Sequence, residues 1–143
     1  MIITIYCLVH PITLIPFYVG ATNGKINIRL AGHLTNARYT YIDRHTQETK
    51  HAYNTEKDIF IRSILSIGRK PIIRSIISCD IHEANHYELF FYNLLNAQGF
   101  KMYHKEPHGY KEKITNERRY VLKNKQLRKY SQLCCKDILI IIW

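Results

Sequence analysis

The chain has 143 residues, 46% of them apolar and 22% charged, which suits one compact domain with a short appendage and excludes two full domains or wholesale disorder. Its 21 Lys and Arg against 11 Asp and Glu give a formal net charge of +10, so we expect a polyanionic partner such as nucleic acid or an anionic membrane surface. Residues 1–100 carry a net charge of +3 and residues 101–143 carry +7, so most of the excess lies near the C-terminal end.

Two strands and a helix are predicted at the start of the chain. Residues 2–9 are rich in β-branched side chains, and a second β-rich run follows a turn at 14–20. Asn23-Gly24 marks the end of this hairpin. From 25 to 38 the apolar positions approximate a helical period, which predicts a first helix. Its apolar stripe comprises Ile26, Ile28, Leu30, Leu34 and Ala37.

The middle of the chain contains a polar segment and a second helix. Residues 39–54 are polar and aromatic without periodicity, so we predict a loop that is long enough to have a function. Thr55, followed three residues later by Asp58, is typical of a helix N-cap. We therefore predict a second helix that begins there and ends at Gly68.

A third strand and a third helix complete the predicted order. The strand is predicted at 71–79, and Asp80 then caps a helix that ends at Gly99. The order β-β-α-α-β-α indicates the α+β class, with a small three-stranded sheet, mainly antiparallel or mixed, flanked by helices. Such a sheet offers no deep crevice, so chemistry would lie on an open face that suits a large substrate.

The C-terminal part is strongly basic and is predicted to contain a helix from about 115 to 133. We divide the chain into a domain at 1–105 and a basic helical extension with an apolar end at 106–143. Because each neutralised phosphate adds salt-dependent affinity, this helix is predicted to bind DNA without sequence choice, the alternative being a solubilising helix face. The predicted DNA-binding residues are Arg118, Arg119, Lys123, Lys125, Arg128 and Lys129.

The compartment is predicted from what the sequence lacks. No signal peptide and no apolar run long enough to span a membrane are evident, so we expect an intracellular, cytoplasmic protein. The four cysteines have neither the spacing of a zinc site nor that of a disulfide framework, which predicts reduced thiols. The apolar residues 138–143 are more typical of a strand or docking segment than of an anchor.

Two short strand motifs and three later residues carry a family resemblance. The motifs, about ten residues apart, are Thr4-Ile5-Tyr6 and Tyr18-Val19-Gly20. Two of the later residues stand one helical turn apart on the first predicted helix, and another lies on the third: Arg29, His33 and Glu88. In this pattern, over roughly residues 2–100, the chain resembles the GIY-YIG nucleases, and the predicted order of strands and helices is similar to theirs.

The resemblance implies an active site with five catalytic residues. Glu88 would be the metal ligand, for Mg²⁺ or for Mn²⁺ in its place. Arg29 would bind the scissile phosphate, and one phenol, Tyr6 rather than Tyr18, would act as general base or orient the attacking water. His33 would hold the phenol or pass a proton.

Elementary chemistry is consistent with these roles. A single carboxylate with phosphate oxygens and waters commonly holds Mg²⁺, and the guanidinium fork matches phosphate oxygens. A phenol has a reference pKa near 10, so a basic role requires nearby cations, which Arg29, the metal or protonated His33 would supply. Gly20 is expected to provide a positive φ or close approach of the substrate. Each residue also has a structural alternative. The two tyrosines could be ordinary strand residues, the arginine and histidine could lie on a solvated helix face, and the glutamate could be an exposed helix carboxylate.

Two positions of the family pattern stay open. Members often have an asparagine after the glutamate helix, and this position is left unassigned among Asn96, Tyr103 and His104. Some relatives add a histidine or a lysine after the arginine helix, for which His45 and Lys50 are candidates.

The sequence therefore predicts a divalent-metal-dependent endonuclease that hydrolyses DNA phosphodiester bonds, with DNA as its partner, no small-molecule cofactor and no membrane. The first alternative is a nucleic-acid-binding protein that keeps the fold without catalysis. The second is a module that binds a membrane surface or a protein through its basic helix. High sequence specificity would have to come from residues 39–54 or from dimerisation, so a homodimer stays open.

Overall fold

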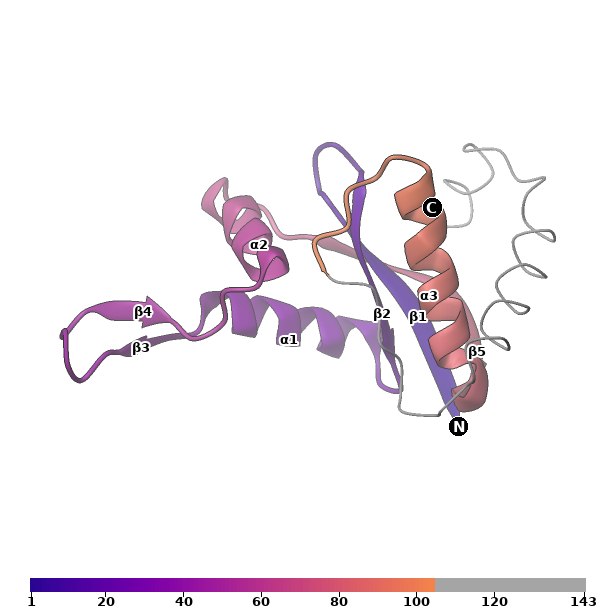
Figure 1. The fold of residues 1–143 in the computed structure, drawn as a ribbon, viewed down its shortest axis with the longest axis horizontal. Helices are drawn as coiled ribbons and strands as arrows, with labels where there is room; N and C mark the ends of the chain where they lie inside the picture. The colour runs from indigo at the N-terminus through magenta and orange to yellow at the C-terminus, as the bar shows by residue number, and fades with distance from the viewer. Residues whose placement is uncertain (105–143) are drawn as a thin grey trace.

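A computed structural model describes residues 1–104 of the chain (Figure 1). Its centre is a three-stranded sheet in the order β2-β1-β5, formed by β1 (Ile2–Val9), β2 (Pro16–Thr22) and β5 (Ile72–Asp80). β2 begins two residues later than predicted because Leu14 lies in the turn with a φ of 61°. β1 pairs antiparallel with both neighbours, which confirms the α+β class and makes the sheet antiparallel rather than mixed.

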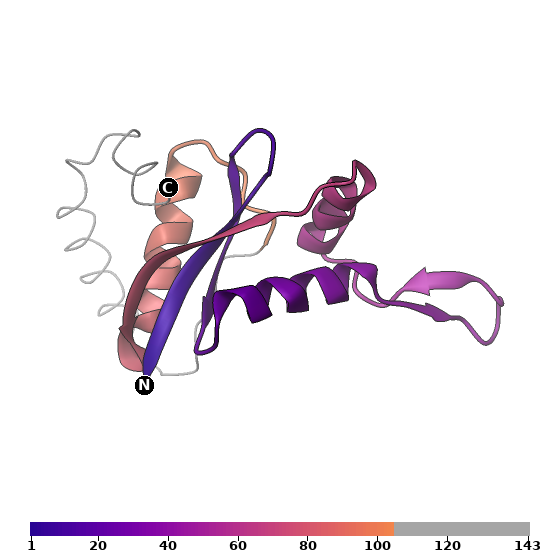
Figure 2. The same ribbon diagram turned by 180° about the vertical axis from the view of Figure 1, so that it is seen from behind.

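Three helices cover the two faces of this sheet. They are α1 (Ile26–Arg38), α2 (Glu56–Ser66) and α3 (Ile81–Ala97). In the opposite views of Figures 1 and 2, α3 lies on one side of the sheet and α1 and α2 lie on the other. The sheet is therefore the middle layer of three.

The alternation of side chains along β1 separates two cores. Ile3, Ile5 and Cys7 are buried with residues of α3, whereas Tyr6 and Leu8 are buried with residues of α1 and α2. Successive side chains of a strand point to opposite faces, so a central strand between two helical layers is buried on both. β1 places a tyrosine on the face that α1 and α2 cover.

The predicted signals for the ends of α2 and α3 are confirmed. Thr55 and Asp58 form a capping box at the start of α2, in which each side chain accepts the backbone N–H of the other residue. The Asp80 side chain caps α3 by accepting the backbone N–H two residues on. Gly68 and Gly99 follow the two helices with φ of 74° and 88°, a conformation that L side chains rarely adopt.

The buried face of α1 differs from the apolar stripe predicted for it. Leu34 and Ala37 are buried as expected, but the Ile28 side chain is 69% exposed. His33 is buried in its stead. The helix turns a polar side chain towards the sheet because Tyr6 offers that side chain a hydrogen-bond partner there.

The loop predicted at 39–54 is wrong, because these residues form a second, two-stranded sheet. β3 (Thr40–Ile42) and β4 (Thr49–His51) pair antiparallel. The Asp43 carboxylate orders the turn between them, since it accepts two backbone N–H groups and pairs with Lys50 Nζ at 2.6 Å. The strands are short and exposed, so they lack the hydrophobic alternation on which the prediction depended.

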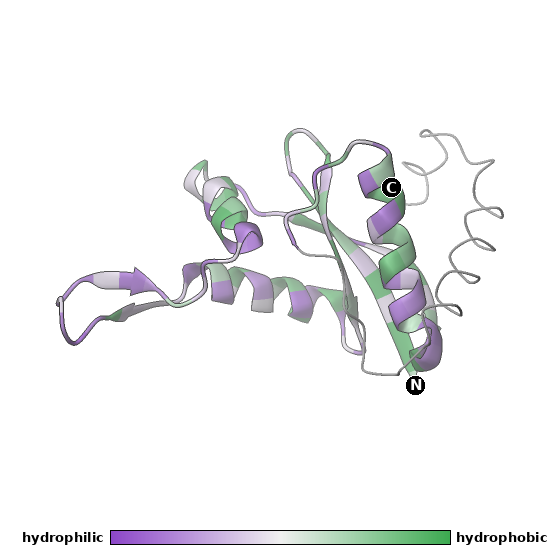
Figure 3. Ribbon diagram, in the orientation of Figure 1, coloured by the Kyte–Doolittle hydropathy of each residue, from purple (hydrophilic) through white to green (hydrophobic). Residues whose placement is uncertain are grey.

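Arg62 of α2 anchors the base of this hairpin to the domain. Its guanidinium donates to the carbonyl oxygens of Ala37 and Tyr53 and to the Asn54 side chain. Figure 1 shows the hairpin projecting beyond the end of α1, and Figure 3 shows it to be more hydrophilic than β1. The hairpin is thus a polar arm held at its base.

Several predictions fall on residues 105–143, which lie outside the described residues. They are the basic helix, its DNA contacts, the boundary of the extension and the apolar end. Within residues 1–104, no helix is long and apolar enough to cross a membrane. Cys7 and Cys79 are free, buried thiols, as predicted for this part of the chain.

Candidate active site

The two motif tyrosines lie side by side on the face that α1 and α2 cover. Tyr6 on β1 pairs with Gly20, and Tyr18 on β2 pairs with Leu8, so both side chains project from the same face of the hairpin. Their ring centroids are 6.2 Å apart. Tyr6 is fully buried and Tyr18 is partly buried, so Tyr18 is the more accessible phenol.

Gly20 provides the space that the two rings occupy. A Cβ at this position would stand 2.6 Å from the Tyr6 hydroxyl oxygen and 2.8 Å from Tyr18 Cε1. Its φ is not positive, so that explanation from the sequence is wrong, and the close approach that the structure shows is that of the protein's own rings. Position 20 in the second motif must therefore be glycine, because the ring of Tyr6 from the first motif lies over it.

Arg29 and His33 on α1 both bind the Tyr6 hydroxyl. Arg29 Nε donates to the Tyr6 oxygen at 3.0 Å, and His33 Nε2 lies 2.8 Å from the same oxygen. Their spacing of four residues places them on one face of the helix, as the sequence predicted. The Arg29 side chain is otherwise exposed, so its terminal nitrogens are accessible to a ligand.

Lys57 is a member of this cluster that the sequence analysis missed. Its Nζ lies 3.2 Å from His33 Nδ1, 3.3 Å from Asp58 Oδ1 and 5.5 Å from the centroid of the Tyr18 ring. The sequence did contain one signal for it. A lysine in the first turn of a helix is opposed by the helix dipole, so its presence there indicates another purpose.

The two residues proposed from the sequence as an additional histidine or lysine lie in the hairpin and outside this cluster. Lys50 is paired with Asp43, and the backbone N–H of His45 donates to the same carboxylate. Lys57, which also follows the arginine helix in the sequence, is the lysine that lies beside His33.

His33 is neutral at physiological pH. Burial, followed by the charges of Lys57 and Arg29, lowers its pKa to about 3. The expectation that protonated His33 would favour ionisation of a phenol is therefore wrong for the free protein. Its role next to Tyr6 is that of a neutral hydrogen-bond partner.

The phenols also titrate differently from the expectation. Burial, followed by the neighbouring Tyr18, raises the pKa of Tyr6 above its ordinary value, although the hydrogen bond from Arg29 acts in the opposite direction. Burial and then the charge of Glu88 raise the pKa of Tyr18. Both phenols are consequently protonated in the free protein at neutral pH.

Glu88 on α3 brings a carboxylate to the same cluster. Its charge acts on Tyr18 and it is itself affected by Arg29, so it belongs to the electrostatic environment of the site. Burial raises its pKa to about 7, with Arg29 opposing the shift. Within residues 1–104, no cation lies within ion-pair distance of this carboxylate.

The donor set fits a hard divalent cation that keeps most of its water. No group of three or more His, Cys, Asp and Glu side chains converges in the described part of the chain, which disfavours a closed all-protein metal cage there. Mg²⁺ is commonly held by one or two carboxylates together with substrate phosphates and waters. Glu88 meets that requirement, because it is half-buried and no side chain of residues 1–104 forms an ion pair with it.

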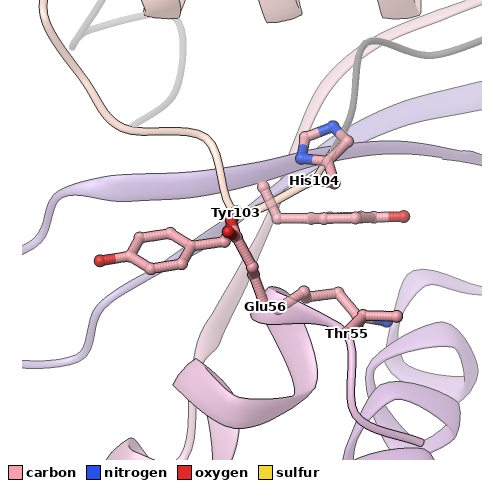
Figure 4. A pocket seen from close by; sticks show the side chains of 6 residues that line it. Thr55, Glu56, Tyr103 and His104 are labelled. Atoms are coloured by element: carbon pink, nitrogen blue, oxygen red, sulfur yellow. The ribbon is translucent and has the colours of Figure 1, made fainter.

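A pocket of about 480 Å³ opens beside Tyr18. Figure 4 shows Tyr103 and His104 above it and Thr55 and Glu56 at the start of α2 below it. The His104 ring lies 4.3 Å from the Tyr18 ring, centroid to centroid, and burial lowers its pKa to about 4. Of the three candidates for the unassigned family position, Tyr103 and His104 line this pocket, whereas Asn96 is exposed near the end of α3.

The chain matches no protein-family model, no curated protein and no solved structure.

Proposed function

We propose that this chain is a divalent-metal-dependent endonuclease of the GIY-YIG type, which hydrolyses phosphodiester bonds of DNA. One observation carries the proposal: of the five residues that the motif pattern selects, the four on β1, β2 and α1 contact one another, and the fifth, on α3, interacts electrostatically with two of them. The five residues are Tyr6, Tyr18, Arg29, His33 and Glu88. A chance similarity of short motifs would not be expected to bring a strand hairpin, α1 and α3 to a common cluster.

Arg29 is suited to bind the scissile phosphate. Its Nε is used by Tyr6, while the terminal nitrogens of the fork are on an exposed side chain. A guanidinium matches two phosphate oxygens and keeps its charge at any physiological pH. We assign it the neutralisation of charge that develops on the phosphate as the bond breaks.

Tyr6 is suited to accept a proton from, or to orient, the attacking water. Arg29 Nε donates to its oxygen, a hydrogen bond that favours the ionised form of a phenol, and His33 Nε2 lies 2.8 Å from the same oxygen. Burial favours the neutral form, so ionisation requires a further positive charge in the site. In this mechanism Tyr18 lies beside Tyr6 at the more open position, where it can hold the same water.

Glu88 is the residue that would hold the metal. A divalent cation bound there would supply positive charge to the phosphate oxygens and to the attacking water. Because the pKa of Glu88 is about 7 in the free protein, protons compete for the carboxylate below neutral pH. The proposal therefore predicts metal binding and cleavage that both increase as the pH rises through 7.

The test is a cleavage time course on supercoiled plasmid, linear and branched DNA with Mg²⁺, Mn²⁺ or EDTA. The variant is Glu88→Gln, which removes the charge and keeps the shape. Its matched control is Glu83→Gln, an exposed glutamate in the first turn of the same helix. We expect metal-dependent nicking or linearisation by the wild type and by the control, and none by Glu88→Gln.

Two outcomes would contradict the proposal. DNA that stays intact in every form while the metal is demonstrably bound would exclude an endonuclease. Salt-sensitive DNA binding by both the wild type and Glu88→Gln, with cleavage by neither, would favour a nucleic-acid-binding protein without catalysis.

A further inference from the structure

We propose that Lys57 is a positioning residue, which holds His33 in the tautomer that carries its hydrogen on Nε2 and thereby directs two donors at the Tyr6 oxygen. The reading of this arrangement as catalytic rests on the function proposed above. The arrangement itself is tested by a measurement that does not require cleavage.

The first step is a count of donors and acceptors at His33. Lys57 Nζ lies 3.2 Å from His33 Nδ1, and an ammonium group donates hydrogen bonds but never accepts them. Nδ1 must therefore be the acceptor. A neutral imidazole has one hydrogen on its two nitrogens, so that hydrogen is on Nε2.

The second step follows at Tyr6. With its hydrogen on Nε2, His33 donates to the Tyr6 oxygen at 2.8 Å, and Arg29 Nε donates to the same oxygen at 3.0 Å. A phenol oxygen that accepts two hydrogen bonds must direct its own hydrogen elsewhere. The hydroxyl hydrogen of Tyr6 therefore points away from both residues, and negative charge on the oxygen would already have two donors in place.

The opposite tautomer would change the chemistry of the pair. With hydrogen on Nδ1, the bare Nε2 of His33 would accept the hydroxyl hydrogen of Tyr6. The Tyr6 phenol would then donate to the imidazole. If the phenol ionised to act as a base, its oxygen would keep Arg29 as a donor but would lose His33. Lys57 decides between the two arrangements because it occupies the Nδ1 side.

Lys57 is held for this purpose and is not an ordinary surface lysine. Only 14% of its side chain is exposed, and its ammonium group is also 3.3 Å from Asp58 Oδ1. Asp58 is fixed in turn by the capping box with Thr55. The start of α2 thus holds the Lys57 ammonium group next to Nδ1, the ring nitrogen of His33 that does not face Tyr6. In other proteins, residues that bind the second ring nitrogen orient catalytic or metal-bound histidines in the same way.

The first test is nitrogen-15 NMR of the imidazole rings in Lys57→Met, Lys57→Arg and wild-type protein. The signals of His33 are identified as those absent from His33→Gln. We expect a single tautomer with hydrogen on Nε2 in the wild type, a shift towards the Nδ1 tautomer in Lys57→Met, and recovery in Lys57→Arg, because a guanidinium also only donates. A wild-type signal with hydrogen on Nδ1, or an unchanged signal in Lys57→Met, would overturn the proposal.

The second test is steady-state cleavage with the same variants. Lys70→Met is the control, because it removes one positive charge at an exposed position outside the cluster. We expect Lys57→Met to lower kcat on the order of 10- to 100-fold with KM unchanged, and Lys57→Arg to recover most of the loss. Equal kcat for Lys57→Met and Lys70→Met in an active enzyme would overturn the positioning role.

The two tests separate this proposal from the proposed function. If the wild type does not cleave DNA but Lys57→Met shifts the His33 tautomer, the endonuclease assignment fails and the placement of the imidazole by Lys57 is supported. Circular dichroism of each variant measures the folded fraction and so shows whether the loss of a tautomer signal is caused by unfolding.

Discussion

The two faces of the sheet bury different kinds of side chain. The face covered by α3 packs only apolar residues in its buried cluster, among them Ile3, Ile5, Cys7, Val19, Phe91 and Leu95. The face covered by α1 and α2 buries the Tyr6 hydroxyl, and His33 and Asp58, the two buried polar or charged residues of the described chain, lie on the same side. One face supplies stability and the other carries the candidate chemistry.

The polar face shows how a small domain can bury polar groups without unfolding. Burying a polar group is unfavourable unless it is hydrogen-bonded. Tyr6 meets Arg29 and His33, and His33 meets Lys57 on its other nitrogen. Burial of apolar side chains on one face offsets the free energy that burial of polar groups costs on the other. α3 serves both faces, because it packs in the apolar core and also contributes Glu88.

The largest expected effect on stability comes from the apolar face. Phe91→Ala removes a side chain that is only 4% exposed and leaves a cavity next to Phe90. Substitutions of this kind cost about 3–5 kcal/mol of unfolding free energy. Chemical denaturation checks the value, and any variant protein that stays folded should keep the wild-type kcat. A low kcat in the folded fraction would contradict the claim that this face supplies stability and not catalysis.

The largest expected effect on activity comes from the polar face. Arg29→Ala should lower kcat on the order of 100- to 1000-fold, because it removes a preorganised positive charge. The stability should change little, since the side chain is largely exposed. Cleavage kinetics and a denaturation curve for the same preparation test both parts. Arg29→Lys should recover only a little activity, because an ammonium lacks the planar fork; full recovery would reduce Arg29 to a point charge.

Glu88, which α3 contributes to the candidate site, makes the stability of the protein sensitive to pH. Its pKa is raised from 4.5 to about 7, so the native state keeps a proton that the unfolded state releases between those values. The contribution of Glu88 to the unfolding free energy should therefore fall as the pH rises from 4.5 to 7 in metal-free buffer. It is measured as the difference between the wild type and Glu88→Gln, because the lowered pKa values of His33 and His104 act in the opposite direction and are common to both proteins. At pH 8, Glu88→Gln should be more stable than the wild type by on the order of 2–3 kcal/mol, and below pH 4.5 the two should agree.

The control for this prediction is the same pair of denaturation curves after Mg²⁺ is added at pH 8. The ion should stabilise the wild type, because binding to the native state adds to its unfolding free energy, and it should leave Glu88→Gln unchanged. Parallel pH profiles for the two proteins in metal-free buffer would show that the carboxylate is not held in the environment described here.

A smaller loss of stability than that of Phe91→Ala is expected from a substitution that tests the contact between the motif residues. Gly20→Ala introduces one methyl group where Tyr6 and Tyr18 leave no space for a Cβ. Overpacking of this kind costs about 1–3 kcal/mol. Because the Tyr6 hydroxyl is held by two hydrogen bonds, we expect the ring to move and kcat to fall, as seen in a cleavage assay. Gly32→Ala on α1, where a Cβ meets nothing within 4 Å, is the matched control.

Much of this arrangement was predictable from local signals. The apolar alternation of β1 and the caps at Thr55 and Asp80 depend on neighbours in the sequence, and the structure has them where they were expected. The motif pattern selected five residues; the structure places Tyr6, Tyr18, Arg29 and His33 in contact, and Glu88 within electrostatic reach of Tyr18 and Arg29. The spacing of residues in the sequence could select them because each one lies in a strand or helix, where the direction of a side chain follows from its position.

The remainder depended on contacts that no local pattern records. Lys57 meets His33 across 24 residues of chain, and the sequence around it indicates only a helix cap. The tautomer of His33 follows from that contact. The β3–β4 hairpin has three-residue strands without a buried face, so its sequence is that of a polar loop. Gly20 is explained only when the ring of Tyr6 is seen to lie over it.

The most direct test compares one residue of the candidate site with one residue of the apolar core in a single assay. Glu88→Gln and Cys79→Ala, at equal folded concentration, are followed with the wild type on supercoiled plasmid in Mg²⁺. We expect Cys79→Ala to cleave at the wild-type rate and Glu88→Gln not to cleave. Cleavage by Glu88→Gln at the wild-type rate would contradict this assignment, because the candidate site could then not depend on the Glu88 carboxylate.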